Sequence, residues 1–477
     1  MDLAAALAAT RDSPALSAAE LVGSSVDVTR LDHDSRAVEA GSVFCCVTGE
    51  HVDGHDFAPA AIAAGATALL CERPLDLGVP EVRVPSVRLA MGPLAAVVAG
   101  RPSDRLDVVG ITGTNGKTTV AHLLAAILEH AGRPCGVIGT LTGARTTPEA
   151  PELQARLVEM EQHGDRAVAM EVSSHALELH RVDGTHFRVA VFTNLTRDHL
   201  DFHGDMSSYF AAKARLFEPS LSERAVVNLD DPYGRLLRDA AELPTTGYSL
   251  ADAEGLVVGP TGSSFSWRGV RVQMALAGRF NVANALAAAT AAAELSIDPE
   301  VIAAGLGAAG PVAGRFELVD EGQPFLVVVD YAHTPDGLEQ VVATARELAG
   351  TGRVLVVFGA GGDRDRTKRP AMGEAVAHGA DVAILTSDNP RGEDPAAIIS
   401  DVHQGITDLT DLLIEPDRRA AIEAAVARAR AGDVLVVAGK GHETTQTIGA
   451  QVVPFDDRVV TREALRAAAV ERGVEGW

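Results

Sequence analysis

Residues 106–132, LDVVGITGTNGKTTVAHLLAAILEHAG, place a glycine loop between an apolar run and an amphipathic segment. The run LDVVGIT at 106–112 predicts a strand buried on both faces. The segment after the loop has an apolar stripe at helical spacing, made of Leu123, Leu124, Ile127 and Leu128. Glycines let successive N–H groups point at phosphate oxygens, and a helix N-terminus adds partial positive charge. This stretch therefore predicts a phosphate loop joining a strand to a helix.

The loop residues predict how a nucleotide would be held. Lys117 would reach the terminal phosphates, and the Thr118 hydroxyl would ligate Mg²⁺. The spacing departs from the standard GxxxxGK[ST] pattern, because Gly110 lies one residue too far upstream and Gly113 lies inside the loop. The alternative is a glycine turn that happens to carry Lys-Thr, but the strand–loop–helix context favours nucleotide binding. The residues expected to contact the nucleotide here are Gly113, Thr114, Asn115, Gly116, Lys117, Thr118 and Thr119.

Composition excludes several classes of protein. At 477 residues the chain is too long for one ordinary domain, and three are expected. A formal net charge of −24 argues against a general nucleic-acid binder, so any anionic substrate needs a local cluster of cations and N–H groups. The four cysteines, Cys45, Cys46, Cys71 and Cys135, have no zinc spacing and are interpreted as reduced, buried thiols. With no signal peptide or membrane-spanning run evident, we expect a cytoplasmic protein without a membrane partner.

The chain divides into three blocks, at residues 1–102, 103–310 and 311–477. The first mixes short strand-like runs with glycine-rich turns, and the second opens with the phosphate loop and closes with an alanine-rich segment, interpreted as helix. The third alternates apolar strands, such as FLVVVDYAH at 325–333, with helical segments. Strand–helix alternation of this kind predicts a parallel sheet covered by helices.

Four strands of the third block each end in a polar motif. The motifs are DYAH at 330–333, GAGGDRD at 359–365, SDNPR at 387–391 and GKGHE at 439–443. Ligands of open α/β sheets bind at the carboxyl ends of the strands. We therefore expect these motifs to converge on one rim, where Arg391 would hold an anion rather than serve as a solvated turn residue.

Further polar clusters follow strand-like runs of the second block. AVAMEVSSH at 167–175 and VAVFTNLTRDHLDFHG at 189–204 bring Glu171 and His199 to the expected phosphate edge. Lys213 lies in the apolar helical segment SSYFAAKARLFEP. A lysine there either extends its amine to solvent or is buried with a depressed pKa and becomes open to modification, because only the neutral amine is nucleophilic. The residues alone leave both alternatives open.

As an ordered set, these motifs resemble the Mur ligases, ATP-dependent enzymes that form amide bonds of the peptidoglycan stem peptide. The resemblance spans all three blocks and includes DSR, DGHDF, GITGTNGKTT, TTPEAPELQ, EVSSHALELHRV, TNLTRDHLDFHGDM, YFAAKA, GRFNVANAL, AGRFE, DYAHTPD, GGDRDRTKRP, SDNPRGEDP and GKGHE. It implies a small N-terminal α/β domain for the UDP-linked substrate, a central phosphate-loop domain with a parallel or mixed sheet, and a C-terminal Rossmann-like, doubly wound domain for the incoming amino acid. A cytoplasmic monomer in cell-wall synthesis, and thereby in cell shape and division, is expected.

The resemblance also implies roles for particular residues. Thr118, Glu171, His199 and a carbamylated Lys213 would form the magnesium site, and Lys117 would act on ATP. Other nucleotide contacts would come from Asn281, Arg315, Asp330 and His333. The substrate UDP-N-acetylmuramoyl-L-alanyl-D-glutamate would be held by Ser35, Thr146, Thr147, Ser173 and Arg181. The incoming amino acid would be held by Arg364, Asp388, Asn389, Pro390, Arg391, Gly439 and Glu443.

The arginine of SDNPR implies the choice of amino acid. A guanidinium can grip the extra carboxylate of meso-diaminopimelate and repel the terminal ammonium of L-lysine. Within the family this motif goes with diaminopimelate, which is therefore the expected substrate. Two departures from relatives are Leu179, where some have a glutamine, and a short segment before Thr146 in which Arg145 replaces an expected asparagine.

Three other functions are possible for a chain with these motifs. The same reaction with L-lysine would leave Arg391 without its carboxylate. A folylpolyglutamate synthase-like ligase shares a related loop but lacks the N-terminal DSR and DGHDF block. A phosphate-loop switch or motor that only hydrolyses ATP would not need the strand-end clusters of the third block.

Overall fold

The phosphate loop belongs to an all-parallel central sheet. In the computed structural model, which describes residues 1–49, 52–407 and 409–471, six strands lie in the order β11-β10-β9-β6-β8-β7. Their bounds are β6 Asp107–Thr112, β7 Cys135–Ile138, β8 Ala167–Glu171, β9 Val189–Phe192, β10 Ala225–Asn228 and β11 Thr245–Tyr248. The predicted strand and helix around the loop are confirmed as β6 and α4 (Lys117–His130).

The predicted apolar stripe of α4 is buried. Leu123, Leu124, Ile127 and Leu128 share one core with the alanine-rich α10 (Arg279–Glu294) and with α11 (Pro299–Ala308). The small side chains of α10 allow close packing behind the phosphate loop. The remaining helices of this region are α5 Ala150–His163, α6 Ser174–Glu178, α7 Leu200–His203, α8 Met206–Ala214 and α9 Pro232–Ala240.

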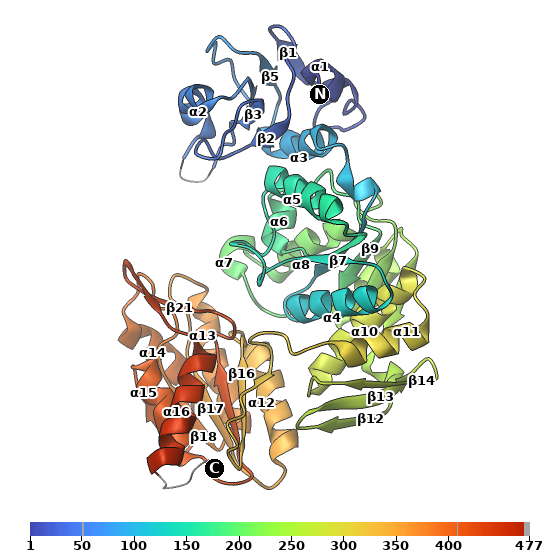
Figure 1. Ribbon diagram of the computed structural model, residues 1–477. Coiled ribbons are helices and arrows are strands. Elements are labelled where there is room, and N and C mark those ends of the chain that lie inside the picture. The colour runs from blue at the N-terminus through green and yellow to red at the C-terminus, as the bar shows by residue number, and fades with distance from the viewer. Residues whose placement is uncertain (50–51, 408, 472–477) are drawn as a thin grey trace.

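A separate three-stranded antiparallel sheet adds to the same core. It consists of β12 (Glu254–Gly259), β13 (Gly262–Trp267) and β14 (Val270–Met274), with Phe265 and Trp267 buried against α10 and its neighbours. Figure 1 shows this sheet below α10 and α11, away from the N-terminal region.

The N-terminal region carries a five-stranded sheet in the order β1-β5-β4-β3-β2, in which only β1 runs antiparallel among the described strands. Its elements are α1 Leu3–Ala8, β1 Glu20–Val22, β2 Arg30–Asp32, β3 Ser42–Cys45, α2 Ala58–Ala64, β4 Ala68–Cys71, β5 Glu81–Arg83 and α3 Val87–Val98. All four cysteines of the chain are free and buried, as expected.

The C-terminal region has a six-stranded sheet in the order β15-β16-β20-β17-β18-β19, parallel except for β15. Its strands are β15 Glu317–Leu318, β16 Leu326–Asp330, β17 Val354–Phe358, β18 Val382–Leu385, β19 Leu412–Ile414 and β20 Val434–Ala438. Its helices are α12 Pro335–Ala349, α13 Arg369–Gly379, α14 Pro395–His403, α15 Arg418–Arg428 and α16 Asp457–Glu471, and a hairpin of β21 Thr445–Ile448 and β22 Gln451–Pro454 follows β20.

Alternate residues of these strands pack against opposite helix layers. Val356 and Phe358 face the core containing α12, α13 and α14, whereas Leu355 and Val357 face the core containing α15 and α16. Side chains of a strand alternate between faces, so continuous apolar runs fit a sheet covered on both sides. The predicted doubly wound arrangement is confirmed.

The arrangement brings the polar strand ends together. Because β16, β20, β17 and β18 are neighbours and parallel, their carboxyl ends share one edge. In Figure 1 the C-terminal sheet stands beside the central region, with α12 and the connection from α11 between them. Among the described helices, none is both long and apolar enough to cross a membrane.

Candidate functional site

The phosphate loop has the backbone shape that the sequence predicted. Gly113 and Gly116 have φ values of 149° and 86°, and a side chain at Gly116 would collide with Asn284 on α10. Lys117 bends back over the loop, where its Nζ donates to the carbonyl oxygens of Gly113 and Thr114, each at 2.9 Å. Burial lowers the pKa of Lys117. The loop is held in shape from within, because the N–H groups of Thr114 and Asn115 donate to Asn194 O and Oδ1, each at 2.9 Å.

Thr118 and Glu171 meet beside the loop. The Thr118 hydroxyl donates to Glu171 Oε1 at 3.0 Å, and the backbone N–H of Thr140 donates to the same oxygen at 2.8 Å. Arg315, from the C-terminal part of the chain, donates from Nη2 to Thr118 Oγ1 at 3.0 Å. The hydroxyl and the carboxylate are buried oxygen donors of the kind that Mg²⁺ prefers.

Lys213 is buried in α8 with 1% of its surface exposed, so the alternative that it extends its amine to solvent is wrong. Its Nζ donates to Gly113 O at 2.8 Å and lies 4.7 Å from the centre of the Tyr209 ring. Burial, together with the nearby charge of Lys117, places the pKa of Lys213 well below its ordinary value. A neutral amine at the back of the phosphate loop is the state that reacts with an electrophile.

His199 caps the N-terminus of α7 with a left-handed backbone, φ 55°. Burial lowers the pKa of its ring to about 3, against the opposing charge of Asp198. The ring lies edge-on to His175, with centroids 4.8 Å apart. Over the described residues, no three His, Cys, Asp or Glu side chains gather as a ready-made metal site. A cation held here would therefore need ligands besides Glu171 and His199, such as the Thr118 hydroxyl.

The residues expected to contact the nucleotide differ in whether their polar atoms are already bonded within the protein. Arg315 stacks on Tyr331, 4.4 Å from the ring centre, and its buried Nε has no hydrogen-bond partner among the described residues. Such an orphaned donor suits a bound anion. Asp330 instead accepts from the backbone N–H groups of Phe316 and Ala332, both at 2.7 Å, and Asn281 donates to Ala277 O at 2.8 Å.

The residues expected for the UDP-linked substrate largely lie together. Thr147 Oγ1 accepts from Ser173 N at 3.0 Å, and Arg181 Nη1 donates to Thr147 O at 3.4 Å. Thr146 Oγ1 lies 3.0 Å from Thr140 Oγ1, beside the Glu171 carboxylate that Thr140 contacts. Ser35 lies in a half-buried turn after β2 of the N-terminal sheet.

Sequence reasoning missed Glu149 in this group. Its buried carboxylate lies 2.9 Å from Arg181 Nε and 2.7 Å from Arg88 Nη1 on α3. The residue therefore links the N-terminal region to a predicted substrate residue. Glu149 belongs to the TTPE motif, from which only Thr146 and Thr147 were predicted to bind the substrate.

The C-terminal rim forms as predicted from its four motifs. Asn389 Nδ2 donates to Glu443 Oε2 at 2.8 Å, and Gly439 has no room for a side chain beside the Asp388 carboxylate. Arg391 donates from Nη1 to Gly362 O at 2.7 Å, whereas Arg364 on the neighbouring loop is exposed. Pro390 is buried before Arg391. The rim thus carries two guanidinium groups beside two carboxylates.

Lys440 is a second residue that the sequence did not single out. It is fully buried, and its Nζ contacts Asn389 Oδ1 at 3.3 Å, Glu443 Oε2 at 3.1 Å and Thr445 O at 2.7 Å. Because Asn389 Oδ1 also accepts from Thr447 N at 3.0 Å, the amide of Asn389 is engaged in holding the rim.

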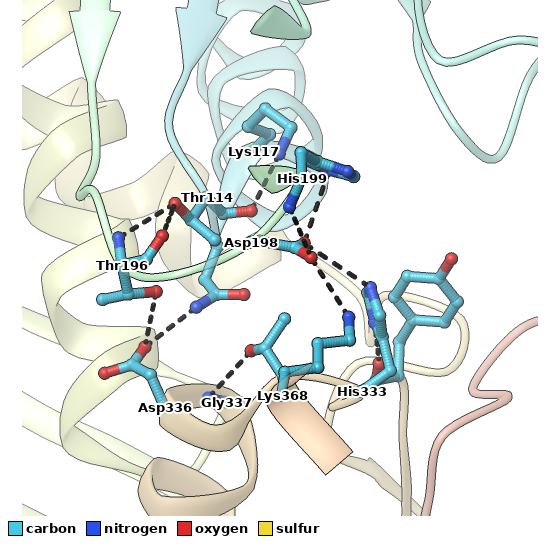
Figure 2. A network of polar contacts seen from close by, with 12 residues as sticks. Thr114, Lys117, Thr196, Asp198, His199, His333, Asp336, Gly337 and Lys368 are labelled. Carbon is cyan, nitrogen blue, oxygen red and sulfur yellow. Dashed lines mark hydrogen bonds and ion pairs between the residues drawn. The ribbon is translucent and has the colours of Figure 1, made fainter. Parts of the chain in front are cut away.

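The rim and the phosphate loop meet through side chains of both regions (Figure 2). Asn115 Nδ2 donates to Asp336 Oδ2 at 2.9 Å, which joins the loop to the first turn of α12. Lys368 Nζ lies 3.1 Å from Asp198 Oδ1, and His333 Nε2 lies 4.0 Å from the other oxygen of Asp198. The expected nucleotide residue His333 therefore lies across from the expected metal residue His199.

Fold and site together define a phosphate-loop enzyme whose C-terminal sheet presents a mixed-charge rim to the loop. The sequence matches three family descriptions: "Mur ligase family, catalytic domain" over residues 27–99, "Mur ligase middle domain" over 111–292 and "Mur ligase, glutamate ligase domain" over 314–441. The chain belongs to the Mur ligase family.

Individual relatives agree over nearly the whole length. The chain is 47% identical to a UDP-N-acetylmuramoyl-L-alanyl-D-glutamate–2,6-diaminopimelate ligase of Streptomyces coelicolor, with 93% of each chain covered. It is 45% identical to the protein of the same name from Geobacillus thermodenitrificans, covering 93% of this chain and 96% of the relative. A solved structure of a ligase with this name is 36% identical, with a TM-score of 0.66 over 92% of this chain and 95% of the other.

Proposed function

We propose that this chain is an ATP-dependent, ADP-forming ligase that joins meso-diaminopimelate to UDP-N-acetylmuramoyl-L-alanyl-D-glutamate. The observation that carries the proposal is the rim at the carboxyl ends of parallel strands, where Arg391 and Arg364 both approach Gly361. On the same rim, Asp388 lies beside Gly439 and Glu443 accepts from Asn389. A rim of both charge signs complements an amino acid that has two ammonium groups and two carboxylates. The names of relatives 44–47% identical to the chain support the same substrate pair.

The three regions would divide the substrates. Residues 1–102, with Ser35, would bind the UDP-linked end, residues 103–310 would bind ATP, and residues 311–477 would bind the amino acid. Thr146, Thr147, Ser173 and Arg181 would hold the dipeptide next to the phosphate loop. The contacts of Glu149 support a substrate site shared by the first two regions, because they tie Arg88 of α3 to Arg181 of the central region.

The phosphate loop would bind ATP through its backbone N–H groups and Lys117. Arg315 would meet the nucleotide with its unpartnered Nε, while Asn281, Asp330 and His333 would complete the site. Thr118 and Glu171, with His199, would hold Mg²⁺, which when bound offsets phosphate charge during phosphoryl transfer. The Thr118–Glu171 oxygen pair fits a hard cation, whereas the unmodified amine of Lys213 offers no oxygen ligand.

Carbamylation of Lys213 would remove that mismatch. The neutral Nζ adds to the carbon of CO₂ and loses a proton to solvent, which leaves a carbamate whose single negative charge is shared by two oxygens. The buried position and depressed pKa of Lys213 favour this reaction, because the amine stays unprotonated. The same burial shields the carbamate from exchange with water.

Amide formation requires that the glutamyl carboxylate be activated and that the amine be brought next to it. A carboxylate does not react with an amine at neutral pH, so transfer of the terminal phosphoryl group of ATP to the glutamyl carboxylate forms an acyl phosphate. Attack by the amine expels phosphate and leaves the amide. Lys117 would offset the transferred charge, and docking of the rim beside the loop would bring amine and acyl group together without bulk water.

The setting of the reaction follows from the same contacts. Every residue named for the site comes from one chain, so a monomer is sufficient. Reduced, buried cysteines fit a cytoplasmic enzyme, and a net charge of −24 fits small anionic substrates held by local cations rather than nucleic acid.

The class of reaction is tested by following ADP release while substrates are omitted one at a time. We expect turnover only when ATP, the UDP-linked dipeptide and an amino acid are all present. A folylpolyglutamate synthase-like activity would require a folate instead. ADP release at the full rate with ATP alone would identify a hydrolase and contradict the proposal.

A further inference from the structure

Asp198 and Lys368 form a buried ion pair between two regions of the molecule. Asp198 follows β9 of the central sheet, and Lys368 ends the short 3-10 helix Arg366–Lys368 before α13. Their Nζ–Oδ1 distance is 3.1 Å, and the two side chains are only 7% and 8% exposed. The residues lie 170 positions apart in the sequence, so the pair exists only when the two regions are docked.

The Asp198 carboxylate is also a meeting point for both halves of the proposed site. His199 Nε2 lies 3.4 Å from Asp198 Oδ2, and His333 Nε2 approaches the same oxygen at 4.0 Å from the C-terminal side. Figure 2 shows Asp198 between these two rings and the lysine. A movement of Lys368 would therefore change the surroundings of His199, proposed for the metal site, and of His333, proposed for the nucleotide site.

Other contacts across this interface are more exposed or involve an uncharged group. Arg197 Nη2 donates to Thr367 Oγ1 at 2.7 Å at an exposed position, and Asp336 accepts from the uncharged amide of Asn115. Arg279 of α10 pairs with Glu347 of α12 at 3.3 Å, but these side chains are 58% and 37% exposed. Lys368–Asp198 differs from these three contacts because it has a full charge on each side and is shielded from solvent. Removing one partner of such a pair leaves an uncompensated buried charge, which is strongly unfavourable.

We propose that Lys368 and Asp198 are a positioning pair, an interdomain latch that holds the C-terminal rim in register with the phosphate loop. The inference rests on the proposed function for its kinetic consequences, although the latch itself is a property of the fold. An ion pair suits a reversible contact, because both groups are rehydrated when the regions separate and the net cost of opening stays small. An apolar contact of the same area would resist opening more strongly.

The primary test is kinetic and uses Lys368→Met in the full chain. We expect kcat/KM for the amino acid to fall by roughly 30-fold or more, the lower end for breaking one side of a buried pair. The Kd of a non-hydrolysable ATP analogue should change less than about threefold, because the loop itself is intact. Lys368→Arg should restore most of the loss. Equal losses in nucleotide binding and kcat/KM, or no loss at all, would overturn the proposal.

A matched control and a double variant separate a latch from general destabilisation. Arg419→Met breaks the exposed Arg419–Glu463 ion pair of the C-terminal region, at 2.7 Å, and should leave kcat/KM unchanged. Asp198→Asn combined with Lys368→Met should be no worse than the single variants, because both remove the same interaction. Losses that multiply instead would show that the two residues act independently.

Small-angle X-ray scattering tests the latch without any substrate. Lys368→Met should increase the radius of gyration relative to wild type, because the C-terminal region is released from the central one, while Arg419→Met should not. An unchanged radius would overturn the latch even if ligase activity is confirmed. If wild-type protein lacks ligase activity but the radius responds, the proposed function fails and the latch stands.

Discussion

At the scale of single residues, the proposed chemistry depends on buried side chains whose protonation state is set by their surroundings. Lys213 shows this most directly, because its amine sits behind the phosphate loop with a backbone carbonyl at 2.8 Å and with Lys117 as a neighbouring charge. A protonated amine there would be costly. The structure thus turns one of two open alternatives for this lysine into a chemical expectation.

Lys213→Ala should nearly abolish turnover, since the proposed carbamate oxygens are lost. Adding a short carboxylate such as acetate should restore part of the rate by supplying replacement oxygens in the vacated space. The measurement is steady-state ADP release with and without acetate, with the wild type as control for acetate itself. Full activity of the alanine variant would contradict the role of Lys213.

Arg391→Ala tests the proposed recognition of the distal carboxylate. Loss of one charge-assisted, partly buried contact should cost on the order of 2–5 kcal/mol, which raises the KM for diaminopimelate by roughly 30-fold or more. The affinity for ATP should stay unchanged, because the residue belongs to the rim. An unchanged KM would show that Arg391 only secures the loop through Gly362.

Glu149→Gln tests a residue that sequence reasoning did not find. The amide keeps the shape of the side chain but removes the charge that faces Arg88 and Arg181. A loss of about 1–3 kcal/mol is expected, seen as a KM for the UDP-linked substrate raised about fivefold or more. Glu152→Gln on the same helix removes a half-exposed pair with Arg156, rather than one with Arg88 or Arg181, and should leave this KM unchanged. Equal behaviour of the two variants would refute the role of Glu149.

At the scale of elements, the loop that carries Arg391 is shaped by its partners. Arg391 has a left-handed backbone, φ 50°, and its N–H and C=O groups bond to Thr447 and Gly449 of the β21–β22 hairpin at 3.0 and 2.7 Å. A conformation that is uncommon for a residue with a side chain is thereby held in place. The hairpin therefore helps to aim the guanidinium.

Glu393 anchors the other end of the same loop and gives it a pH dependence. Hydrogen bonds from Arg369 lower the pKa of Glu393 to about 2 from its ordinary value of 4.5. The stabilisation is thus fully present above about pH 4.5 and is lost as the pH falls toward 2. Glu393→Gln should lower the melting temperature at pH 7, and the difference from wild type should shrink at about pH 3. A difference that stays constant between these pH values would contradict the ion pair.

Sequence patterns predicted many of the helices and strands, but they did not predict which side chains contact one another in the fold. The strands and helices around the phosphate loop and the alternation of the C-terminal block were readable, because burial on two faces leaves continuous apolar runs and helices leave stripes. Strand β19 and the β21–β22 hairpin were missed, since they are short and largely polar or exposed. Glu149 and Lys440 lie inside motifs that were noticed, but their roles depend on neighbours supplied by the fold.

At the scale of the whole molecule, what sequence could not supply is the interface between regions. Asp198 and Lys368 meet across 170 positions, and no local pattern predicts that contact. The strand-end rule predicted a common rim, but not that the C-terminal region would contact the central region through Asp336, Arg315 and Lys368. That facing arrangement is what makes amide formation from two separately bound substrates physically reasonable.

The central claim is that the chain forms an amide with meso-diaminopimelate. It is tested most directly by offering wild-type protein an equimolar mixture of meso-diaminopimelate and L-lysine, with ATP, Mg²⁺ and UDP-N-acetylmuramoyl-L-alanyl-D-glutamate. The products are then separated by mass. We expect the diaminopimelate product to dominate, because Arg391 would attract its distal carboxylate and repel the ammonium of lysine. A mixture dominated by the lysine product, or the absence of any amide product, would contradict it.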